Sequence, residues 1–211
     1  MRMDNNVLAM NGLSVDLLTR LSYRSCLGLS LKRTLRHFDK DALLAELFAM
    51  ADWLDETPGL SGVALDYRIK SYASIRGKYD RYLDSPRHAS QVFNDILGFR
   101  AFCDSYEEVL GLKSDIFAVA DMSEGKADDD GYRGVHLYFQ LDNEHYPIEI
   151  QYNTLYDRQM NNWLHDYLYK KDYPGEVGRQ LRLMYEQGKI KNEAAFEEAL
   201  NDVLSGGKGY K

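Results

Sequence analysis

Proline and cysteine are scarce in this sequence of 211 residues. It has 4 prolines and 2 cysteines, whereas 45% of its residues are hydrophobic. So little proline excludes a collagen-like or proline-rich disordered chain, and the hydrophobic content requires a packed core. Cys26 and Cys103 lack the spacing of a metal site, so we expect two small core residues without a functional role.

Long apolar runs are also missing. No stretch reaches the roughly 18 apolar residues of a membrane-spanning helix, and Met1–Leu13 contains an acid and amides where a signal peptide is apolar. We therefore expect a cytoplasmic protein with no membrane partner. The length suits one core. We expect a single domain over 1–204, with N-terminal helices (1–60), a core segment (61–170), C-terminal helices (171–204) and a disordered tail (205–211).

Acidic residues outnumber basic ones, 33 to 26, but the charges are unevenly distributed. The basic segment 17–38 contains no acid and these five basic residues: Arg20, Arg24, Lys32, Arg33 and Arg36. A net charge of −7 argues mildly against a surface coated for nucleic acid, although a local basic patch is compatible with it. Charge runs are commonly solvated faces, and for this segment alone both interpretations stay open.

Hydrophobic periodicity predicts the secondary structure. Helical spacing covers 41–56, 73–83, 155–168, 176–187 and 193–204, with a shorter helical stretch at 105–111. Alternating or continuous apolar segments predict strands at 63–70, 96–103, 115–121, 132–141 and 145–152, with a hairpin turn at 142–144. This order predicts an α+β domain in which helices flank a mixed sheet of about five strands.

One predicted strand and the helix after it bring cations together. Arg68 and Lys70 alternate with apolar residues and so share a strand face, Ser71 begins the helix, and Lys78 and Arg81 follow at helical spacing. Polyphosphates are typically bound by basic side chains together with the backbone amides at a helix N-terminus. Surface salt bridges are the alternative interpretation, and spacing alone does not decide between the two.

Two isolated acids, Asp95 and Glu149, stand in otherwise apolar strand segments. Either acid alone would more often be a structural hydrogen-bond acceptor. Beside a cationic phosphate site, however, a carboxylate pair is typical of phosphoryl transfer, because the acids hold Mg²⁺ and the ion neutralises the developing charge. The combination leads to the hypothesis of a Mg²⁺-dependent phosphoryl-transfer site.

A series of short motifs follows one order along the chain. It consists of Arg68-Ile-Lys70-Ser71, Ser74-Ile75-x-x-Lys78-x-x-Arg81, Asp95-x-x-Gly98-x-Arg100, Gly131-Tyr132-x-x-x-His136, Glu149-Ile150-Gln151 and Trp163-x-His165. From about residue 63 to 170 the series resembles the synthetase domain of RelA/SpoT-type enzymes, most of all the single-domain small alarmone synthetases. The resemblance implies a nucleotidyltransferase-like fold and a pyrophosphokinase that transfers the β,γ-pyrophosphate of ATP to a ribose 3′-hydroxyl.

The resemblance also implies roles for individual residues. By matching position, ATP would be bound by Arg68, Lys70, Ser71, Lys78, Arg81 and Arg100. Asp95 would bind Mg²⁺, and Glu149 would bind metal or deprotonate the attacking hydroxyl. Tyr132 would stack on the acceptor base, with His136 and Gln151 near it.

Three features depart from the family pattern. The segment 125–130 lacks the usual Pro-Lys element, Gly134 replaces the usual serine, and Asn153 replaces the usual arginine. All three lie on the acceptor side, whereas the ATP-binding positions keep the pattern. This asymmetry indicates an unchanged donor and a changed acceptor.

Toxic members of toxin–antitoxin modules resemble this pattern, and some transfer pyrophosphate to the 3′-CCA end of tRNA, which blocks translation. A tRNA acceptor needs a basic surface that binds its phosphate backbone, called the landing surface here. The candidates for it are Lys32, Arg33 and Arg36. The protein partner would be a cognate antitoxin. Two alternatives stay open: GDP or GTP as acceptor, giving an alarmone synthetase, and an inactive nucleotide-binding module, against which the retained acids and cations argue.

Overall fold

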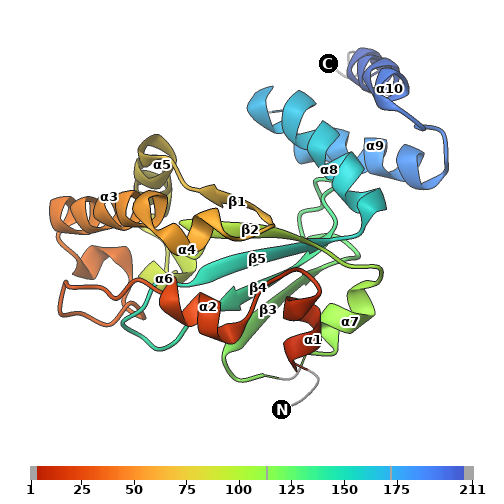
Figure 1. Ribbon diagram of the computed structural model, residues 1–211. Coiled ribbons are helices and arrows are strands. Elements are labelled where there is room, and N and C mark those ends of the chain that lie inside the picture. Colours follow the sequence, from red (N-terminus) through yellow and green to blue (C-terminus); the bar gives the residue numbers. More distant parts are fainter. Residues whose placement is uncertain (1–3, 113, 172, 207–211) are drawn as a thin grey trace. The chain divides into compact units, whose positions relative to one another are not determined.

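The computed structural model describes residues 4–112, 114–171 and 173–206 (Figure 1). One sheet has the strand order β1-β2-β5-β4-β3. Its strands are β1 (Asp66–Ile69), β2 (Leu97–Phe102), β3 (Phe117–Met122), β4 (Gly134–Phe139) and β5 (Ile148–Asn153). β1 pairs with β2 in antiparallel fashion, with Arg68 opposite Gly98. The predicted α+β fold with a five-stranded sheet flanked by helices is confirmed.

Helices precede the sheet, connect its strands and follow it. They are α1 (Asp4–Ala9), α2 (Val15–Arg20), α3 (Lys40–Glu56), α4 (Pro58–Ser61), α5 (Tyr72–Tyr82), α6 (Ala89–Val92), α7 (Tyr106–Leu110), α8 (Leu155–Tyr167), α9 (Gly175–Glu186) and α10 (Glu193–Gly206), with 3₁₀ turns η1 (Leu35–His37) and η2 (Tyr169–Lys171). The helices predicted from periodicity are thus confirmed. None of the helices in the described ranges is long and apolar enough to cross a membrane.

Some boundaries differ from the predictions. β1 begins only at Asp66, and its four residues are mostly exposed, because β1 is an edge strand rather than a half-buried one. Between α2 and α3 the chain is irregular apart from η1, so the N-terminal 60 residues are not helical throughout. Cys26 is exposed rather than part of the core, whereas Cys103 is buried. Of the predicted tail, Ser205 and Gly206 belong to α10 and 207–211 lie outside the described residues.

The chain divides into two compact units. Unit 1 comprises Met1–Ala101, Glu107–Ala120 and His136–Tyr152, and unit 2 comprises Phe102–Tyr106, Asp121–Val135 and Asn153–Lys211. A single domain over 1–204 stays a prediction.

The central strands of unit 1 give the sheet one apolar and one polar face. The apolar face is buried and includes Leu137, Phe139, Ile148, Ile150 and Tyr152. On that side the Tyr152 hydroxyl donates to the Val7 carbonyl of α1 at 3.2 Å. Because side chains alternate along a strand, the residues between them in β4 and β5, among them Glu149 and Gln151, lie on the opposite face. The chemistry-bearing side chains of these strands therefore share one surface.

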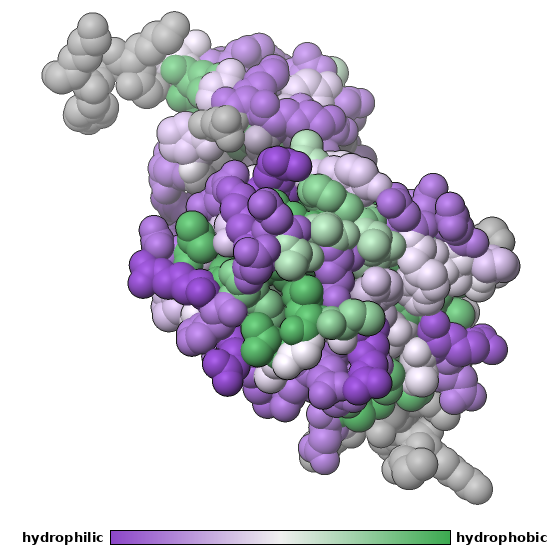
Figure 2. All heavy atoms as spheres, turned by 90° about the vertical axis from the view of Figure 1, so that its left-hand side faces the viewer, coloured by the Kyte–Doolittle hydropathy of each residue, from purple (hydrophilic) through white to green (hydrophobic). Residues whose placement is uncertain are grey.

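Two capped helices border this surface at the β1 edge. The Asp39 side chain caps α3 by accepting from the Ala42 amide at 2.9 Å, and α3 packs against α5 and β1. The hydroxyl of Ser71 caps α5, so this helix begins directly after β1. Figure 2 shows the face on the α3 side, where hydrophilic residues surround a central group of hydrophobic ones.

Unit 2 packs α8, α9 and α10 around an apolar cluster that includes Trp163, Leu164 and Phe196. A fully buried cation, Arg182 of α9, lies beside this cluster. Its guanidinium donates to the Gly131 carbonyl at 2.7 Å, to Asp157 Oδ1 at 2.7 Å and to Asn161 Oδ1 at 3.0 Å. Arg182 therefore fastens the loop that carries Gly131 to helices α8 and α9.

Arg182→Met should lower the free energy of unfolding by about 3–5 kcal/mol, because the Asp157 carboxylate would stay buried without its cation. Chemical denaturation followed by circular dichroism measures this loss. Arg179→Met on the same helix is the matched control, since Arg179 pairs with Glu176 at the surface and should lose far less. Equal losses in the two variants would contradict the role given to Arg182.

Candidate active site

Asp95 is the centre of a lysine–aspartate cluster in unit 1. Its Oδ2 accepts from Lys70 Nζ at 2.6 Å, and its Oδ1 accepts from Lys78 Nζ at 2.9 Å. Lys70 directly follows β1. Its amide donates to the Ile96 carbonyl at 2.8 Å and so extends the pairing of β1 with β2 by one residue. Lys78 comes from α5. A strand end, a helix and the segment before β2 thus bring three charges together.

Charge and burial oppose each other in this cluster. Burial lowers the pKa of Lys70, and the charge of Asp95 partly opposes that effect. Burial also raises the pKa of Asp95, but Lys78 and Lys70 together hold that pKa below its ordinary value. Asp95 therefore stays ionised at neutral pH. The cluster thus joins two lysines to a single aspartate, a composition suited to binding phosphate.

Glu149 of β5 is buried on the polar face, at 7% exposure. Its Oε1 accepts from the Tyr138 hydroxyl at 3.2 Å and lies 3.0 Å from His136 Nδ1, while Gln151 Nε2 donates to Oε2 at 2.7 Å. Burial raises the pKa of Glu149, but His136 and Gln151 bring it below its ordinary value. Glu149 is therefore an ionised, firmly oriented carboxylate that can accept a proton from a hydroxyl group.

Gly98 of β2 allows Glu149 to lie close to the lysine–aspartate cluster. It lies opposite Arg68 in the β1–β2 register, and a Cβ atom at this position would lie 3.2 Å from Glu149 Oε2. The absence of a side chain thus leaves room beside β2 for the glutamate of β5. Asp95 is near enough to raise the pKa of Glu149 through its charge. The structure therefore brings Arg68, Lys70, Lys78, Asp95 and Glu149 to one region, as expected from the sequence.

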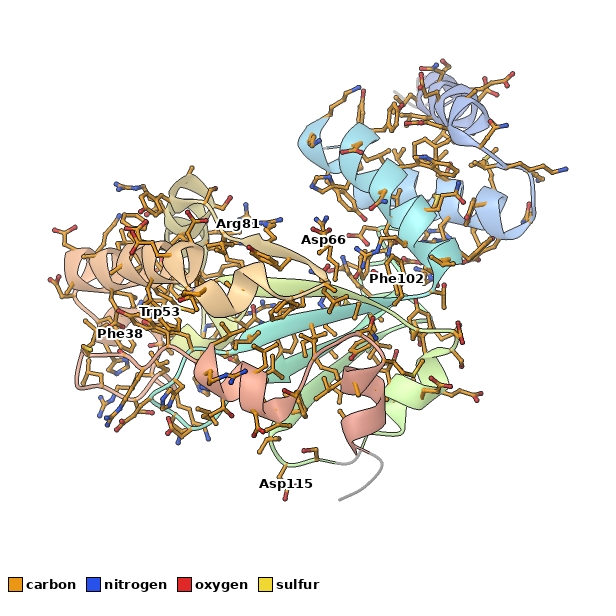
Figure 3. The ribbon with its side chains drawn as sticks, viewed as in Figure 1. Phe38, Trp53, Asp66, Arg81, Phe102 and Asp115 are labelled. Atoms are coloured by element: carbon orange, nitrogen blue, oxygen red, sulfur yellow. The ribbon has the colours of Figure 1, made fainter. Side chains whose placement is uncertain are left out.

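The remaining predicted ATP-binding residues lie at the rim of this region. Arg100 of β2 forms an ion pair with Asp66, its partner across the strands, at 3.0 Å. Arg68 and Arg81 are exposed, and Figure 3 labels Asp66 at β1 and Arg81 on α5. Ser71 already accepts from the Ser74 amide as the α5 cap, so its hydroxyl is held near the start of that helix.

Tyr132 belongs to unit 2, where it adjoins two of the positions that depart from the family pattern. A Cβ atom on Gly134 would lie 2.8 Å from the Tyr132 hydroxyl and 2.6 Å from Asn153 Nδ2. Lys126, from the third departing segment, places Nζ 5.0 Å from the centre of the Tyr132 ring. Gly134 and Lys126 therefore adjoin this tyrosine, and Asn153 adjoins Gly134.

Sequence reasoning missed the side chains that hold the Tyr132 loop. Arg133 binds both carboxylate oxygens of Asp129, at 2.8 and 3.1 Å, and Arg182 holds the carbonyl of Gly131. Gly131 has a φ of 88°, a conformation that favours glycine. The Gly131-Tyr132 pair itself was a usable signal. The contacts of Arg182 with Asp157 and Asn161 have no local signature, because the partners are distant in the sequence.

The basic segment 17–38 is less basic in space than along the chain. Arg36 forms an ion pair with Asp84 at 2.7 Å, and Arg24 forms one with Glu144 at 2.5 Å. Acids from other segments thus approach a run that contains no acid along the sequence. Lys32 and Arg33 are exposed, and they are the better candidates for a landing surface.

Asp95 and Glu149 are also the candidate Mg²⁺ ligands. Proteins commonly hold Mg²⁺ through one or two carboxylates together with substrate phosphates, and this pair fits that donor set. Within the ranges that the structure describes, no group of three or more His, Cys, Asp or Glu side chains is placed to hold a metal ion. Phosphate oxygens would therefore have to complete the coordination shell.

Gly98→Ala should lower the free energy of unfolding by about 1–3 kcal/mol, because the added methyl group presses on a buried carboxylate that three side chains hold in place. Thermal and chemical denaturation measure the change. Gly77→Ala is the matched control: Gly77 lies within α5 with nothing within 4 Å of the added atom, so alanine should stabilise by up to about 1 kcal/mol. A Gly98→Ala variant as stable as wild type would show that Glu149 is not confined as described.

Comparisons with known proteins bear on the family. Residues 67–173 match the family described as the region found in RelA/SpoT proteins. Similar solved structures include the small alarmone synthetase 1 of Bacillus subtilis bound to its product pppGpp, at 21% identity and a TM-score of 0.43, covering 81% of this chain and 92% of that one. Another is the small alarmone synthetase 2 of Bacillus subtilis, at 18% identity and a TM-score of 0.44, covering 81% and 99%.

A GTP pyrophosphokinase family protein from Streptococcus pneumoniae is similar at 22% identity and a TM-score of 0.40, covering 76% of this chain and 93% of that one. No curated protein matches the chain. The family match spans half of the 211 residues and includes the lysine–aspartate cluster, Glu149 and Tyr132. The chain therefore belongs to the RelA/SpoT family of pyrophosphokinases.

Proposed function

We propose that the protein transfers the β,γ-pyrophosphate of ATP to the 3′-hydroxyl at the CCA end of tRNA. It would thereby inhibit translation as the toxin of a toxin–antitoxin module, with a cognate antitoxin as its protein partner. One observation carries the transfer chemistry: two lysines bind Asp95 at 2.6 and 2.9 Å beside the buried, ionised Glu149. Cations for a phosphate and a positioned base are thus neighbours.

The donor would lie over the β1 edge of the sheet. Arg68, Arg81 and Arg100 are accessible there, and Lys70 and Lys78 can exchange their contact with Asp95 for phosphate oxygens. The start of α5 at Ser71 adds backbone N–H groups that point towards an anion. Mg²⁺, when bound by Asp95 and Glu149 with the phosphates, would neutralise part of their charge.

The chemical step is a displacement at the β-phosphorus. A bond forms between the ribose 3′ oxygen and this phosphorus, the bond to the oxygen that bridges the α- and β-phosphates breaks, and AMP leaves. Glu149 takes the proton of the hydroxyl. Because its pKa is below the ordinary value, Glu149 is a weak base, and its contribution comes from its fixed position rather than from basicity.

Two observations support tRNA as the acceptor. A Cβ atom on Gly134 would approach both Tyr132 and Asn153, so two of the departures from the family pattern lie beside the residue expected to hold the acceptor base or beside its neighbour. Stacking on tyrosine tolerates adenine as well as guanine. In addition, Lys32 and Arg33 present exposed cations suited to an RNA backbone.

A guanosine nucleotide is the second candidate acceptor, and a different observation favours it. Asp84 and Glu144 neutralise two cations of the basic segment, Arg36 and Arg24. The landing surface is thereby reduced, and GDP or GTP needs no landing surface. With this acceptor the same residues would make an alarmone.

Incubation with γ-labelled ATP and Mg²⁺ separates these acceptors. We expect label at the 3′ end of deacylated tRNA and none when EDTA removes the metal ion. Asp95→Asn should abolish transfer to every acceptor, because the lysines and the metal ion lose their common carboxylate. Label in GDP or GTP alone would establish the second candidate. Absence of label in all acceptors would favour an inactive nucleotide-binding module.

The landing surface is tested by the double variant Lys32→Glu/Arg33→Glu. Transfer to tRNA should fall strongly, ATP binding should be unchanged, and the slope of log affinity against log salt should decrease by about 1.5–2, as expected for two lost phosphate contacts. Lys189→Glu/Lys191→Glu changes the net charge by the same amount at exposed positions between α9 and α10 and should leave transfer intact. If the two double variants behave alike, Lys32 and Arg33 do not form the surface that binds tRNA.

A further inference from the structure

A hollow of about 410 Å³ lies in unit 1 on the polar side of the sheet. Tyr138 of β4, Gln140 just after β4 and Ala118 of β3 line one side of it, and Ser90, Gln91 and Asn94 at α6 line the other. None of the roles assigned above uses this hollow. Its volume falls within the range of small-molecule sites and suits about one nucleotide.

Tyr138 connects the hollow to the proposed reaction centre. The same side chain that lines the hollow donates from its hydroxyl to Glu149 Oε1 at 3.2 Å. A molecule in the hollow therefore lies one side chain away from the carboxylate that would take the proton. The hollow is placed to hold the part of the acceptor next to the reacting ribose.

Strand order places the hollow on the side opposite the donor. In the order β1-β2-β5-β4-β3, Glu149 on β5 separates the cations at β1 from the hollow over β4 and β3. In Figure 3, Asp66 at β1 and Asp115 before β3 mark these two edges of the sheet. In-line transfer requires the attacking and leaving oxygens on opposite sides of the phosphorus. The hollow therefore lies on the side from which an acceptor would approach.

The lining suits a nucleobase. Gln91 accepts from the His88 amide through Oε1 at 3.0 Å, and Gln140 donates through Nε2 to the His145 carbonyl at 2.9 Å. These bonds fix both amide groups, with the Nε2 of Gln91 and the Oε1 of Gln140 available to a ligand. Amide side chains read base edges of unpaired RNA, and tyrosine offers a stacking surface. Arg87 also lines the hollow and supplies a cation for a phosphate.

The hollow adjoins the exposed cations of the basic segment. The amides of Ser90 and Ala89 donate to the carbonyls of Leu31 and Arg33 at 3.0 and 2.8 Å, so Lys32 and Arg33 lie alongside α6. A second hollow of about 300 Å³ shares Ala118, Tyr138 and Gln140 with the first and is lined by Lys32, but also by Asp115 and Asp142. These two acids repel phosphate, which favours the first hollow over the second for an RNA ligand.

We propose that the first hollow binds the nucleotide directly 5′ of the acceptor adenosine, which is a cytidine in the CCA end. Its base would lie against Tyr138 between Gln91 and Gln140, and its phosphate would face Arg87. The site thereby selects an acceptor that continues as single-stranded RNA over a lone mononucleotide. This inference rests on the proposed transfer to tRNA.

The test fills the hollow without removing any of its polar groups. Ala118→Phe places a ring in the hollow from exposed strand β3, and Val119→Phe is the matched control, because Val119 is an exposed neighbour that points to the opposite face. Transfer rates are measured with tRNA, with an oligonucleotide ending in CCA, with 5′-AMP and with GDP. Ala118→Phe should lower kcat/KM for both RNA acceptors about tenfold or more, as expected for the loss of one stacked base.

The same variant should leave the KM for ATP and the slow transfer to 5′-AMP unchanged, and Val119→Phe should resemble wild type throughout. If Ala118→Phe modifies tRNA as fast as Val119→Phe, the hollow does not bind RNA, although transfer to tRNA stands. An equal loss with GDP would show that the hollow holds any nucleotide acceptor and would overturn the proposed selectivity. A wild-type protein that modifies GDP but neither RNA would overturn both proposals.

Discussion

Two carboxylates lie close together under one face of this sheet, and the rest of the site depends on keeping both of them ionised. The charge of Asp95 raises the pKa of Glu149, and burial raises the pKa of each. Left alone, one member of such a pair would take up a proton. Lys70 and Lys78 prevent this at Asp95, and His136 does so at Glu149. The lysines that would hold ATP thus also keep the acids charged before ATP arrives.

The scaffold positions these charges through a few local features. The register that puts Arg68 opposite Gly98 places a residue without a side chain beside Glu149. A slip of one residue would turn every side chain of β1 to the other face and separate the cations from the acids. Capping by Ser71 starts α5 directly after β1, so that Lys78 returns to Asp95. Strand register and helix start therefore act together on a single ion cluster.

The acceptor side has its own coupled set of residues. Because a side chain at 134 would collide with both Tyr132 and Asn153, glycine at 134 and asparagine at 153 belong to one arrangement in this chain. Their departure from the family pattern is thus a joint change around one aromatic ring. Arg182 and Arg133 hold the loop that carries this ring. Substitution of Gly134 alone would therefore shift the tyrosine rather than restore another acceptor site.

The sequence by itself determined the longer helices, most of each strand, the α+β class and the grouping of Arg68, Lys70 and Lys78. Periodicity and close spacing are local properties and can be read without a fold. Tertiary structure alone decided which charges meet. It paired Arg36 with Asp84 and Arg24 with Glu144, buried Arg182 beside Asp157, and opened the hollow between β4 and α6. Each of these features joins segments far apart in the chain, and only packing determines which distant side chains become neighbours.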